Sequence, residues 1–472
     1  MIGRQDRWQD DLFVSGPLRD LVPDDHILKR VEKVLDLSWL REEVRDCYCE
    51  ENGRPSIDPE SAVRLMLAGF FQGIVHDRTL MREAQVNLAI RWFAGYRLDE
   101  KLPDHSSLTR LRQRWGPERF KRIFQKTVET CVKAGLVDLD TVHVDATLIR
   151  ADVSWGSLVE VHAEKVLTEN AEAPDAPPDG GAKPPKAKKI STTDPDATMT
   201  TNRKDQRLEP SYKQHTAVDD KSGVIVDVEV TTGEESEGKQ LLEQLGRVEA
   251  NTGKSAGTVT ADGSYAHAAN YEALEARKID AVIPPQREPR ANKPMPLMRF
   301  RYDARHDVVR CPEGRKLRRS CRTAKGWMYR ARLRDCQRCP RRASCLTRSV
   351  TARQVLIVDG YAALLRARRR RLRWDDATVE KYVRHRWRVE GVHGVAKTQH
   401  GLRRAARRGL SNVRIQSYLT AAVMNLKRLA ALLWALFFGC AGRRTVARVI
   451  RARPEAFSRR RSDFRAPVRL AA

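Results

Sequence analysis

Two kinds of hydrophobic spacing alternate along the chain and divide it into regions. Residues 1–137 carry apolar positions at helical spacing. One helix begins at Asp58-Pro59, an N-cap followed by proline at the first helical position. A second helix, capped by Ser106 or Ser107, ends at Gly116-Pro117, and another amphipathic helix follows. We therefore predict an all-α N-terminal domain.

From Val142 the spacing changes to that of strands. Residues 142–145 alternate and stop at an aspartate, and residues 212–218 and 224–230 form two alternating runs. The polar residues between these runs, Asp219 and Asp220 among them, predict a hairpin turn. The pattern then predicts a helix over about 236–250, a strand over 258–262, a helix over about 267–277 and a strand over 281–283.

The remaining segments complete the predicted organisation. Residues 138–285 form the first part of a mixed α/β domain, interrupted at 171–189 by a Pro-, Ala- and Lys-rich stretch that predicts a disordered loop. A basic, cysteine-containing insert covers 286–352. Residues 353–442 return to helix and form the second part of the α/β domain, and 443–472 form a basic tail.

The charge of the chain favours a polyanionic partner. The sequence has 88 Lys and Arg against 61 Asp and Glu, a formal net charge of +27, which favours nucleic acid. The longest apolar run, from Leu429 to Gly442, is shorter than the about 20 residues that a bilayer requires, so it predicts a core helix and no membrane partner. Nine cysteines and an N-terminus without an apolar signal segment favour a cytoplasmic location.

Two aspartates stand where apolar strands are predicted to end. Asp145 follows Val-His-Val, and Asp262 follows Thr-Val-Thr-Ala. Carboxylates at strand ends are well placed to hold a cation in the adjoining crevice, and two of them suggest a shared metal site. The alternative is that each is an ordinary turn residue at the end of its strand.

A third acid is predicted on a helix near residue 390. At 100° per residue, Arg386, Glu390 and Lys397 share one helix face, with His393 beside it. A carboxylate between two cations suits a site that binds metal and DNA phosphate together. The alternative, an exposed i, i+4 salt bridge, is the more common explanation for such a pair taken alone.

Together these pieces resemble a known family. The order strand-Asp145, hairpin, helix, strand-Asp262, insert, helix-Glu390 resembles the ribonuclease-H-like domain of bacterial insertion-sequence DDE transposases. Asp262-Gly-Ser-Tyr is similar to the family's second-aspartate segment, and Arg386-x3-Glu390-x6-Lys397 is similar to its Tyr-Arg-Glu-Lys signature. Residues 103–110 resemble the InsH-type N-terminal helical domain. The resemblance covers about residues 10–435 and is nearest to the subgroup typified by insertion sequence eleven-eighty-two.

The resemblance implies an α/β, ribonuclease-H-like catalytic domain that cuts and joins DNA. Asp145 would bridge two Mg²⁺ (or Mn²⁺) ions, and Asp262 and Glu390 would hold one each. It implies double-stranded DNA partners, the transposon ends and target DNA, and a homodimer or higher assembly in the synaptic complex. Arg386 and Lys397 would clamp phosphates.

One residue departs from the family signature. The tyrosine should stand three residues before Arg386, where this chain has Val383, and Tyr382 is one residue further back. Tyr382 would therefore reach the DNA from the adjacent helical position. Trp387 is a further candidate for contact with DNA, by stacking on an extruded base, although tryptophan on a helix is more often a core residue.

The predicted N-terminal helix pair offers a second DNA contact. Arg110, Arg112 and Arg114 fall away from the apolar stripe of their helix, as in helix-turn-helix units that dock on DNA. The alternative is a solvated basic face on an ordinary helical bundle.

The insert carries the remaining candidate site. Its cysteines could supply four thiolates for structural Zn²⁺, although only one Cys-x2-Cys pair is present. The residues are Cys311, Cys336, Cys339 and Cys345. The alternative is a set of ordinary buried thiols.

Two other functions compete with a transposase. A catalytically inactive DNA-binding repressor derived from a transposase fits the basic charge equally well, but such a decayed copy should have lost one of Asp145, Asp262 or Glu390. An RNA-binding protein is less consistent, because the sequence lacks an aromatic-rich sheet motif.

Overall fold

The computed structural model describes residues 16–49, 56–160, 189–201, 208–286, 295–347 and 349–437. The predicted disordered loop at 171–189 lies outside the described residues except for Lys189, and the predicted basic tail at 443–472 lies outside them entirely. In the part that is described, no helix is both long and apolar enough to cross a membrane.

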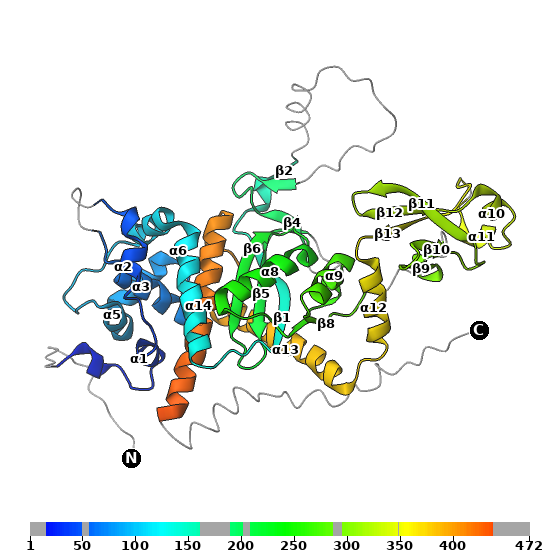
Figure 1. Cartoon of the computed structure of the whole chain (residues 1–472). Helices are drawn as coiled ribbons and strands as arrows, with labels where there is room; N and C mark the ends of the chain where they lie inside the picture. Colours follow the sequence, from blue (N-terminus) through cyan, green and yellow to red (C-terminus); the bar gives the residue numbers. More distant parts are fainter. Residues whose placement is uncertain are drawn as a thin grey trace, which may run out of the picture.

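The N-terminal part is helical, as predicted (Figure 1). Asp58 caps its third α-helix by accepting a hydrogen bond from the backbone N–H of Ser61, as the Asp-Pro pair predicts. The elements are η1 (Leu18–Leu21), α1 (Ile27–Glu32), α2 (Leu40–Glu43), η2 (Arg45–Cys47), α3 (Pro59–Phe71), α4 (Asp77–Val86), α5 (Leu88–Ala94) and α6 (His105–Lys133).

Helix α6 contains the predicted helix pair. Gly116 has φ 67° and ψ 175°, so the helix breaks there and resumes at Pro117. A residue with a β-carbon is strained at this positive φ, which explains the glycine. The cap is Asp104, which accepts from the N–H of Ser106 at 2.8 Å, so the expectation that Ser106 or Ser107 caps this helix was wrong by two or three residues.

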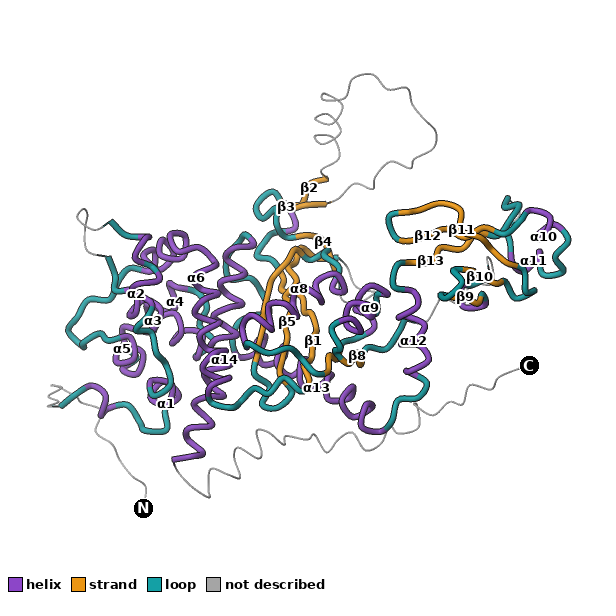
Figure 2. The backbone as a smooth tube through the Cα atoms, viewed as in Figure 1, coloured by secondary structure: helices purple, strands orange, loops and turns teal. Residues whose placement is uncertain are grey.

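A mixed sheet forms the centre of the molecule (Figure 2). Its strand order is β2-β3-β4-β5-β1-β7-β8, and β6 also pairs with β5. β5 and β6 form the predicted hairpin, β1 is antiparallel to β5, and β1, β7 and β8 run parallel. The strands are β1 (Thr141–Arg150), β2 (Leu158–Glu160), β3 (Lys189–Ser191), β4 (Thr198–Thr200), β5 (Glu209–Asp219), β6 (Ile225–Thr232), β7 (Thr258–Thr260) and β8 (Asp280–Val282).

Helices pack against this sheet. α13 contacts β1, β5, β7 and β8, and α8 contacts β1, β5 and β6. α14 lies between the sheet and the N-terminal helices, so one hydrophobic core continues from Leu28 to Ala430 (Figure 1). The elements are η3 (Trp155–Ser157), α8 (Glu237–Thr252), η4 (Gly263–Tyr265), α9 (Ala268–Ala276), α12 (Tyr361–Arg371), α13 (Asp376–Gln399) and α14 (Leu410–Phe437).

The cysteine-containing insert forms a second sheet that stands apart from the first (Figures 1 and 2). Its strand order is β13-β12-β11-β10-β9, and it has a small core of its own that includes Val309, Leu317 and Tyr329. Its last strand lies beyond the predicted end of the insert at residue 352. The elements are η5 (Leu297–Arg299), β9 (Arg301–Asp303), β10 (Val308–Arg310), β11 (Lys316–Thr323), β12 (Gly326–Arg330), α10 (Leu333–Gln337), α11 (Arg342–Cys345) and β13 (Gln354–Val358).

Candidate active site

Asp145 lies in the middle of β1 and not at the end of a strand, so the expected strand end was wrong. The strand continues to Arg150 because the residues after Asp145 pair with β5 in an unbroken register, in which Asp145 is opposite Thr216. Its side chain is 22% exposed, and it points to the same face of the sheet as His143, two residues earlier. Because Asp145 is paired within the sheet, its backbone is fixed by the neighbouring strand, which a turn residue lacks.

Asp262 lies two residues beyond the end of β7, close to the predicted position. Its Oδ1 accepts hydrogen bonds from the Ser264 N–H at 2.8 Å and from the Ser264 hydroxyl at 2.5 Å, so Asp262 caps η4. In the parallel pairing of β1 with β7, Thr260 is opposite His143. Continuing this register by two residues brings Asp262 beside Asp145.

Helix α13 carries the third acid across the same strands. Asp375 caps the helix by accepting from the Thr378 N–H at 2.8 Å. Two buried histidines of α13 contact the sheet. His385 Nδ1 lies 3.0 Å from the Thr260 hydroxyl, and His393 Nε2 lies 3.1 Å from the Thr216 hydroxyl. The buried face repeats at helical spacing and consists of His385, Arg388, Val389, Val392, His393 and Ala396.

His393 brings α13 into contact with Asp145. Its Nδ1 lies 3.7 Å from Asp145 Oδ2. Burial lowers the pKa of His393 to about 3, with the charge of Lys397 acting in the same direction, so the ring is neutral near pH 7. The contact with Asp145 is therefore polar and not an ion pair.

Glu390 and Arg386 form an exposed pair on α13. Their side chains are 61% and 69% exposed, and Arg386 Nε lies 3.4 Å from Glu390 Oε1, the i, i+4 geometry considered from the sequence. An exposed pair of this kind contributes at most about 1 kcal/mol to stability. Stabilisation by the ion pair is therefore a weak reason for an acid at position 390. Lys397 is half-buried and lies seven residues after Glu390 on the same helix. Burial lowers the pKa of Lys397, and the nearby carboxylate of Asp145 opposes that shift.

The electrostatics of Asp145 connect these acids. Burial raises the pKa of Asp145 to about 7, and the carboxylates of Asp262, Glu237 and Glu390 act in the same direction. Like charges around a buried carboxyl group disfavour its ionised form. A divalent cation would remove this repulsion, and carboxylate oxygens are the ligands that Mg²⁺ prefers, so the donor set fits such an ion. Within the described ranges, no three His, Cys, Asp or Glu side chains converge closely enough to form a metal site as they stand.

Tyr382 and Trp387 both precede Glu390 on α13. The ring of Tyr382 stacks on His385 at a centroid distance of 6.3 Å, and burial and the charge of Asp262 raise its pKa, which places it near that acid. Trp387 is 42% exposed and is not a core residue. The guanidinium groups of Arg388 and Arg384 lie 4.5 and 5.9 Å from its ring centroid, so a cationic aromatic surface faces solvent beside Glu390.

The three candidate arginines of α6 do not share one environment. Arg110 is exposed, and Arg114 is exposed with its guanidinium 5.1 Å from the ring centroid of Tyr48. Arg112 is 3% exposed and makes two hydrogen bonds, of 2.6 and 2.7 Å, to the carboxylate of Asp77. The prediction that Arg112 faces DNA was therefore wrong, because the helix turns this residue into the bundle.

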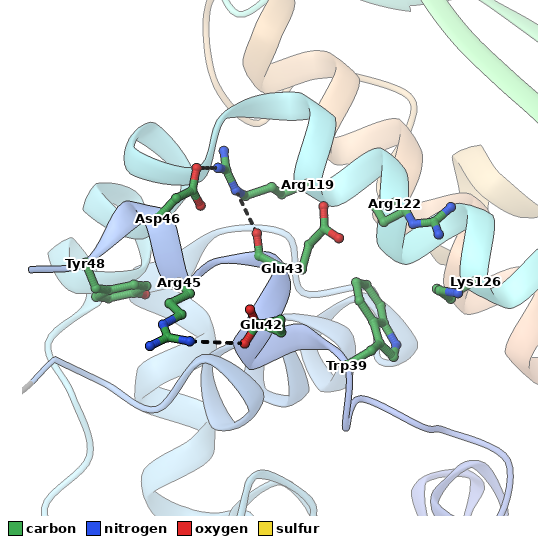
Figure 3. Close-up of a pocket in the computed structure, with 9 residues that line it drawn as sticks. All are labelled: Trp39, Glu42, Glu43, Arg45, Asp46, Tyr48, Arg119, Arg122 and Lys126. Atoms are coloured by element: carbon green, nitrogen blue, oxygen red, sulfur yellow. Dashed lines mark hydrogen bonds and ion pairs between the residues drawn. The ribbon is translucent and has the colours of Figure 1, made fainter. Parts of the chain in front are cut away.

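A hollow of about 890 Å³ opens elsewhere on the N-terminal helices (Figure 3). Trp39 lies in it with Lys126 Nζ 5.8 Å from its ring centroid, and Arg119 binds Asp46 and the carbonyl of Glu43. Its acids and bases neutralise one another, so the hollow does not suit a polyanion.

The four candidate cysteines lie close together in the insert. The backbone N–H of Arg353 donates to Cys336 Sγ at 3.4 Å, and the N–H of Gly314 closes a turn on the Cys311 carbonyl at 2.9 Å. Burial raises the pKa of Cys345, and the nearby thiols of Cys336, Cys339 and Cys311 contribute. They lie near one another but, among the residues described, do not meet in metal-binding geometry.

Sequence reasoning missed Asp220. We interpreted it as a turn residue, whereas it accepts hydrogen bonds or ion pairs from His143 Nε2 at 3.0 Å, Arg388 Nε at 3.2 Å and Arg384 at 2.7 Å. His143 Nδ1 in turn lies 2.6 Å from the Thr260 hydroxyl. Asp220 thus ties α13 to the hairpin and to β1. The sequence signal for Asp220 was the presence of two adjacent aspartates, Asp219 and Asp220, in the same turn.

Comparison with known protein families identifies two segments. Residues 16–114 match the model described as "Transposase domain (DUF772)". Residues 310–430 match the model of the transposase DDE domain. The chain is therefore similar to transposases over these two segments. The second segment contains Glu390 and the four cysteines, whereas Asp145 and Asp262 precede it.

Comparison with solved structures gives distant likenesses. The piggyBac transposase synaptic complex with hairpin DNA matches with a TM-score of 0.34 and 9% identity, over 92% of this chain and 82% of that one. The Mos1 transposase paired-end complex with the left transposon end matches with a TM-score of 0.16 and 14% identity, over 50% of this chain and 61% of that one. Likeness at this level carries no argument about function. No curated protein matches the chain.

Proposed function

We propose that this chain is a DNA transposase that binds the terminal inverted repeats of its own insertion sequence, cleaves the ends and joins the freed 3′-hydroxyl to target DNA. The proposal is supported by the packing of α13, which carries Glu390, on β1 and β7, the strands of Asp145 and of the segment before Asp262. The charges of Asp262 and Glu390 both help to raise the pKa of Asp145, and residues 310–430 match the transposase DDE domain model. The strand order β6-β5-β1-β7-β8, in which only β5 of these five strands runs antiparallel to the others, also supports a ribonuclease-H-like domain.

The acids would act as metal ligands. Asp145, Asp262 and Glu390 would hold two Mg²⁺ or Mn²⁺ ions between them. When bound, such a pair of ions neutralises charge on the attacking and leaving oxygens of an in-line phosphoryl transfer. Asp145 is suited to the central role because it stands mid-strand and among the other acids, where the cation would also relieve its raised pKa.

The cationic groups around the acids would position DNA. Arg386 would exchange its pairing with Glu390 for a phosphate once that acid binds metal, and Lys397 would hold a second phosphate beside Asp145. The exposed ring of Trp387, with two guanidinium groups against it, offers a stacking surface for an extruded base, and Tyr382 would contact the strand on the Asp262 side. Arg110 and Arg114 would contact phosphates from the N-terminal helices.

Two further features complete the proposal. The four cysteines of the insert would bind one structural Zn²⁺ after side-chain rotation and stabilise its small sheet. Because a transposon has two ends that must be brought together, the active assembly would be a homodimer or larger. The competing function, an inactive repressor derived from a transposase, is disfavoured because Asp145, Asp262 and Glu390 are all retained.

Cleavage by single variants tests the proposal. The substrate is a duplex that carries the inverted repeats flanking the gene, incubated with protein in Mg²⁺. We expect Asp145→Asn, Asp262→Asn and Glu390→Gln to bind the duplex as the unmodified protein does, because affinity comes from phosphate contacts. The same variants should lose strand cleavage, because each lacks a proposed metal ligand. Glu243→Gln, an exposed change on α8, is the matched control. A triad variant that nicks at the normal rate would remove that residue from the site.

A further inference from the structure

Glu237 places a fourth carboxylate beside the three acids already described. It is the first residue of α8, and its side chain is 24% exposed. The next residue, Gly238, packs so tightly on the segment after Asp262 that a β-carbon there would lie 2.5 Å from His267 Nε2 and 2.9 Å from the Ser264 carbonyl oxygen. The start of α8 is therefore held against the Asp262 segment.

Ser264 joins Glu237 to Asp262. Its hydroxyl oxygen lies 2.5 Å from Asp262 Oδ1 and 2.7 Å from Glu237 Oε2. A hydroxyl has one proton to donate, and ionised carboxylates only accept. Of the two short contacts, only one can be a hydrogen bond while both acids are ionised, and the other is an unfavourable contact between oxygen atoms. A cation shared by the two carboxylates removes this conflict.

Tyr265 supplies an independent observation. It is fully buried, and its hydroxyl has no hydrogen-bond partner within the described parts of the chain. Burial raises the pKa of Tyr265 well above its usual range, and the charges of Asp145, Glu237 and Asp262 contribute to that shift. The hydroxyl is therefore close to all three acids. An unpaired buried hydroxyl is destabilising, and a ligand water or a rotated carboxylate at this point would satisfy it.

The other carboxylate oxygen of Glu237, Oε1, is paired with a lysine of the sheet. Lys213 Nζ of β5 lies 3.3 Å from Glu237 Oε1 and donates a 2.8 Å hydrogen bond to the carbonyl of Glu235. Lys213 thus fixes Oε1 of Glu237, while Oε2 faces Ser264. Glu237 also acts on Asp145, since its charge helps to raise the pKa of that carboxyl group.

We infer that Glu237 is a fourth acidic ligand of the divalent-cation site, on the Asp262 side, and that Ser264 and Tyr265 orient the ligands there. The inference rests on the proposed function, because it assigns a further residue to the same metal site. Glu237 would bind the cation through Oε2 while Lys213 holds Oε1. The Ser264 hydroxyl would then be free to donate to Asp262 alone, and the Tyr265 hydroxyl would donate to a carboxylate or to a metal-bound water.

Mn²⁺ binding to the full-length protein tests the inference without DNA. Free Mn²⁺ is measured by electron paramagnetic resonance during a titration of the unmodified protein, Glu237→Gln, Asp145→Asn and the control Glu243→Gln. Loss of a ligand or of its supporting partner weakens metal affinity by about 10- to 100-fold. We expect at least a 10-fold loss in Glu237→Gln, a partial recovery in Glu237→Asp, and no change in Glu243→Gln.

Each outcome decides a separate point. If Asp145→Asn loses Mn²⁺ while Glu237→Gln binds it as Glu243→Gln does, the proposed metal site stands and the role of Glu237 is overturned. If the unmodified protein binds no Mn²⁺, or Asp145→Asn binds it equally well, the proposed function loses its metal site. Should Glu237→Gln not fold, Ser264→Ala keeps both acids and removes only the shared hydroxyl. A Mn²⁺ affinity at least threefold weaker supports the inference, and an unchanged affinity contradicts it.

Discussion

Replacement of Asp145 by asparagine should stabilise the metal-free protein. Folding raises the pKa of Asp145 from 3.8 to about 7, chiefly because the group is buried. At about 1.36 kcal/mol per pKa unit, a shift of roughly three units means that the ionised carboxylate opposes folding by about 4 kcal/mol. Asparagine has nearly the same shape and no charge, so it removes this opposition. Because effective dielectric constants in proteins exceed those of a dry interior, we expect a gain of about 2–4 kcal/mol.

The pH dependence gives the sign of the effect. A carboxyl group whose pKa is raised on folding binds more protons in the folded state between pH 3.8 and about 7. The free energy of unfolding therefore falls as pH rises through this window, and it falls less in Asp145→Asn. The two proteins should unfold alike near pH 4 and differ most near pH 8.

The assay is thermal unfolding of full-length protein in a chelator, at pH 4.5 and pH 8. We expect the Tm of Asp145→Asn to exceed that of the unmodified protein by roughly 2–4 °C at pH 8 and by little at pH 4.5. Added Mg²⁺ should raise the Tm of the unmodified protein and leave the variant unchanged. Asp99→Asn, whose side chain is 72% exposed, is the control. An equal or lower Tm for Asp145→Asn at pH 8 would refute the reasoning that this carboxyl group is strained without a cation.

Three other predictions follow from single contacts. Asp220→Asn removes the negative charge that pairs with the buried guanidinium group of Arg388 and the partly exposed one of Arg384. It should lower the free energy of unfolding by about 2–3 kcal/mol, measured by urea denaturation; a change below about 1 kcal/mol would show that α13 is held elsewhere. Arg112→Ala should destabilise the protein by about 3–5 kcal/mol in the same assay, whereas Arg110→Ala should leave stability within about 0.5 kcal/mol and weaken duplex binding. Protein purified without chelator should carry about one zinc per chain, and a Cys336→Ser, Cys339→Ser double variant should lose it; metal analysis that finds no zinc would leave these cysteines as ordinary thiols.

The sequence predicts the secondary structure of the central region well where one periodicity dominates. The alternating valines at 224–230 predict β6. The apolar run that begins at Leu429 predicts the last two turns of α14, which the structure describes up to Phe437. β1 is the exception: its alternation weakens after Asp145, and pairing with β5 on one side determines that the strand continues. Pairing partners are tertiary information, so the end of that strand is not readable locally.

The candidate site shows the same division. Residue type and spacing identify Asp262, and the i, i+4 relation of Arg386 to Glu390 follows from helix geometry alone. Arg112 stands four residues after Leu108 and three before Trp115, so helical spacing places it beside the apolar stripe. Its assignment to solvent overlooked this position, and the residue pairs with Asp77 inside the bundle. Glu237 and Asp220 belong to no spacing pattern, since each reaches the site from a different element.

Strand transfer in a purified system tests the central claim most directly. Full-length protein is incubated in Mg²⁺ with a donor duplex that carries the flanking inverted repeats and with a target plasmid, and the junctions are sequenced. The account predicts donor 3′ ends joined to target DNA by the unmodified protein and by Glu243→Gln, and no joined product with Asp145→Asn, Asp262→Asn or Glu390→Gln. Absence of joined ends with the unmodified protein, or equal joining by a triad variant, would contradict it.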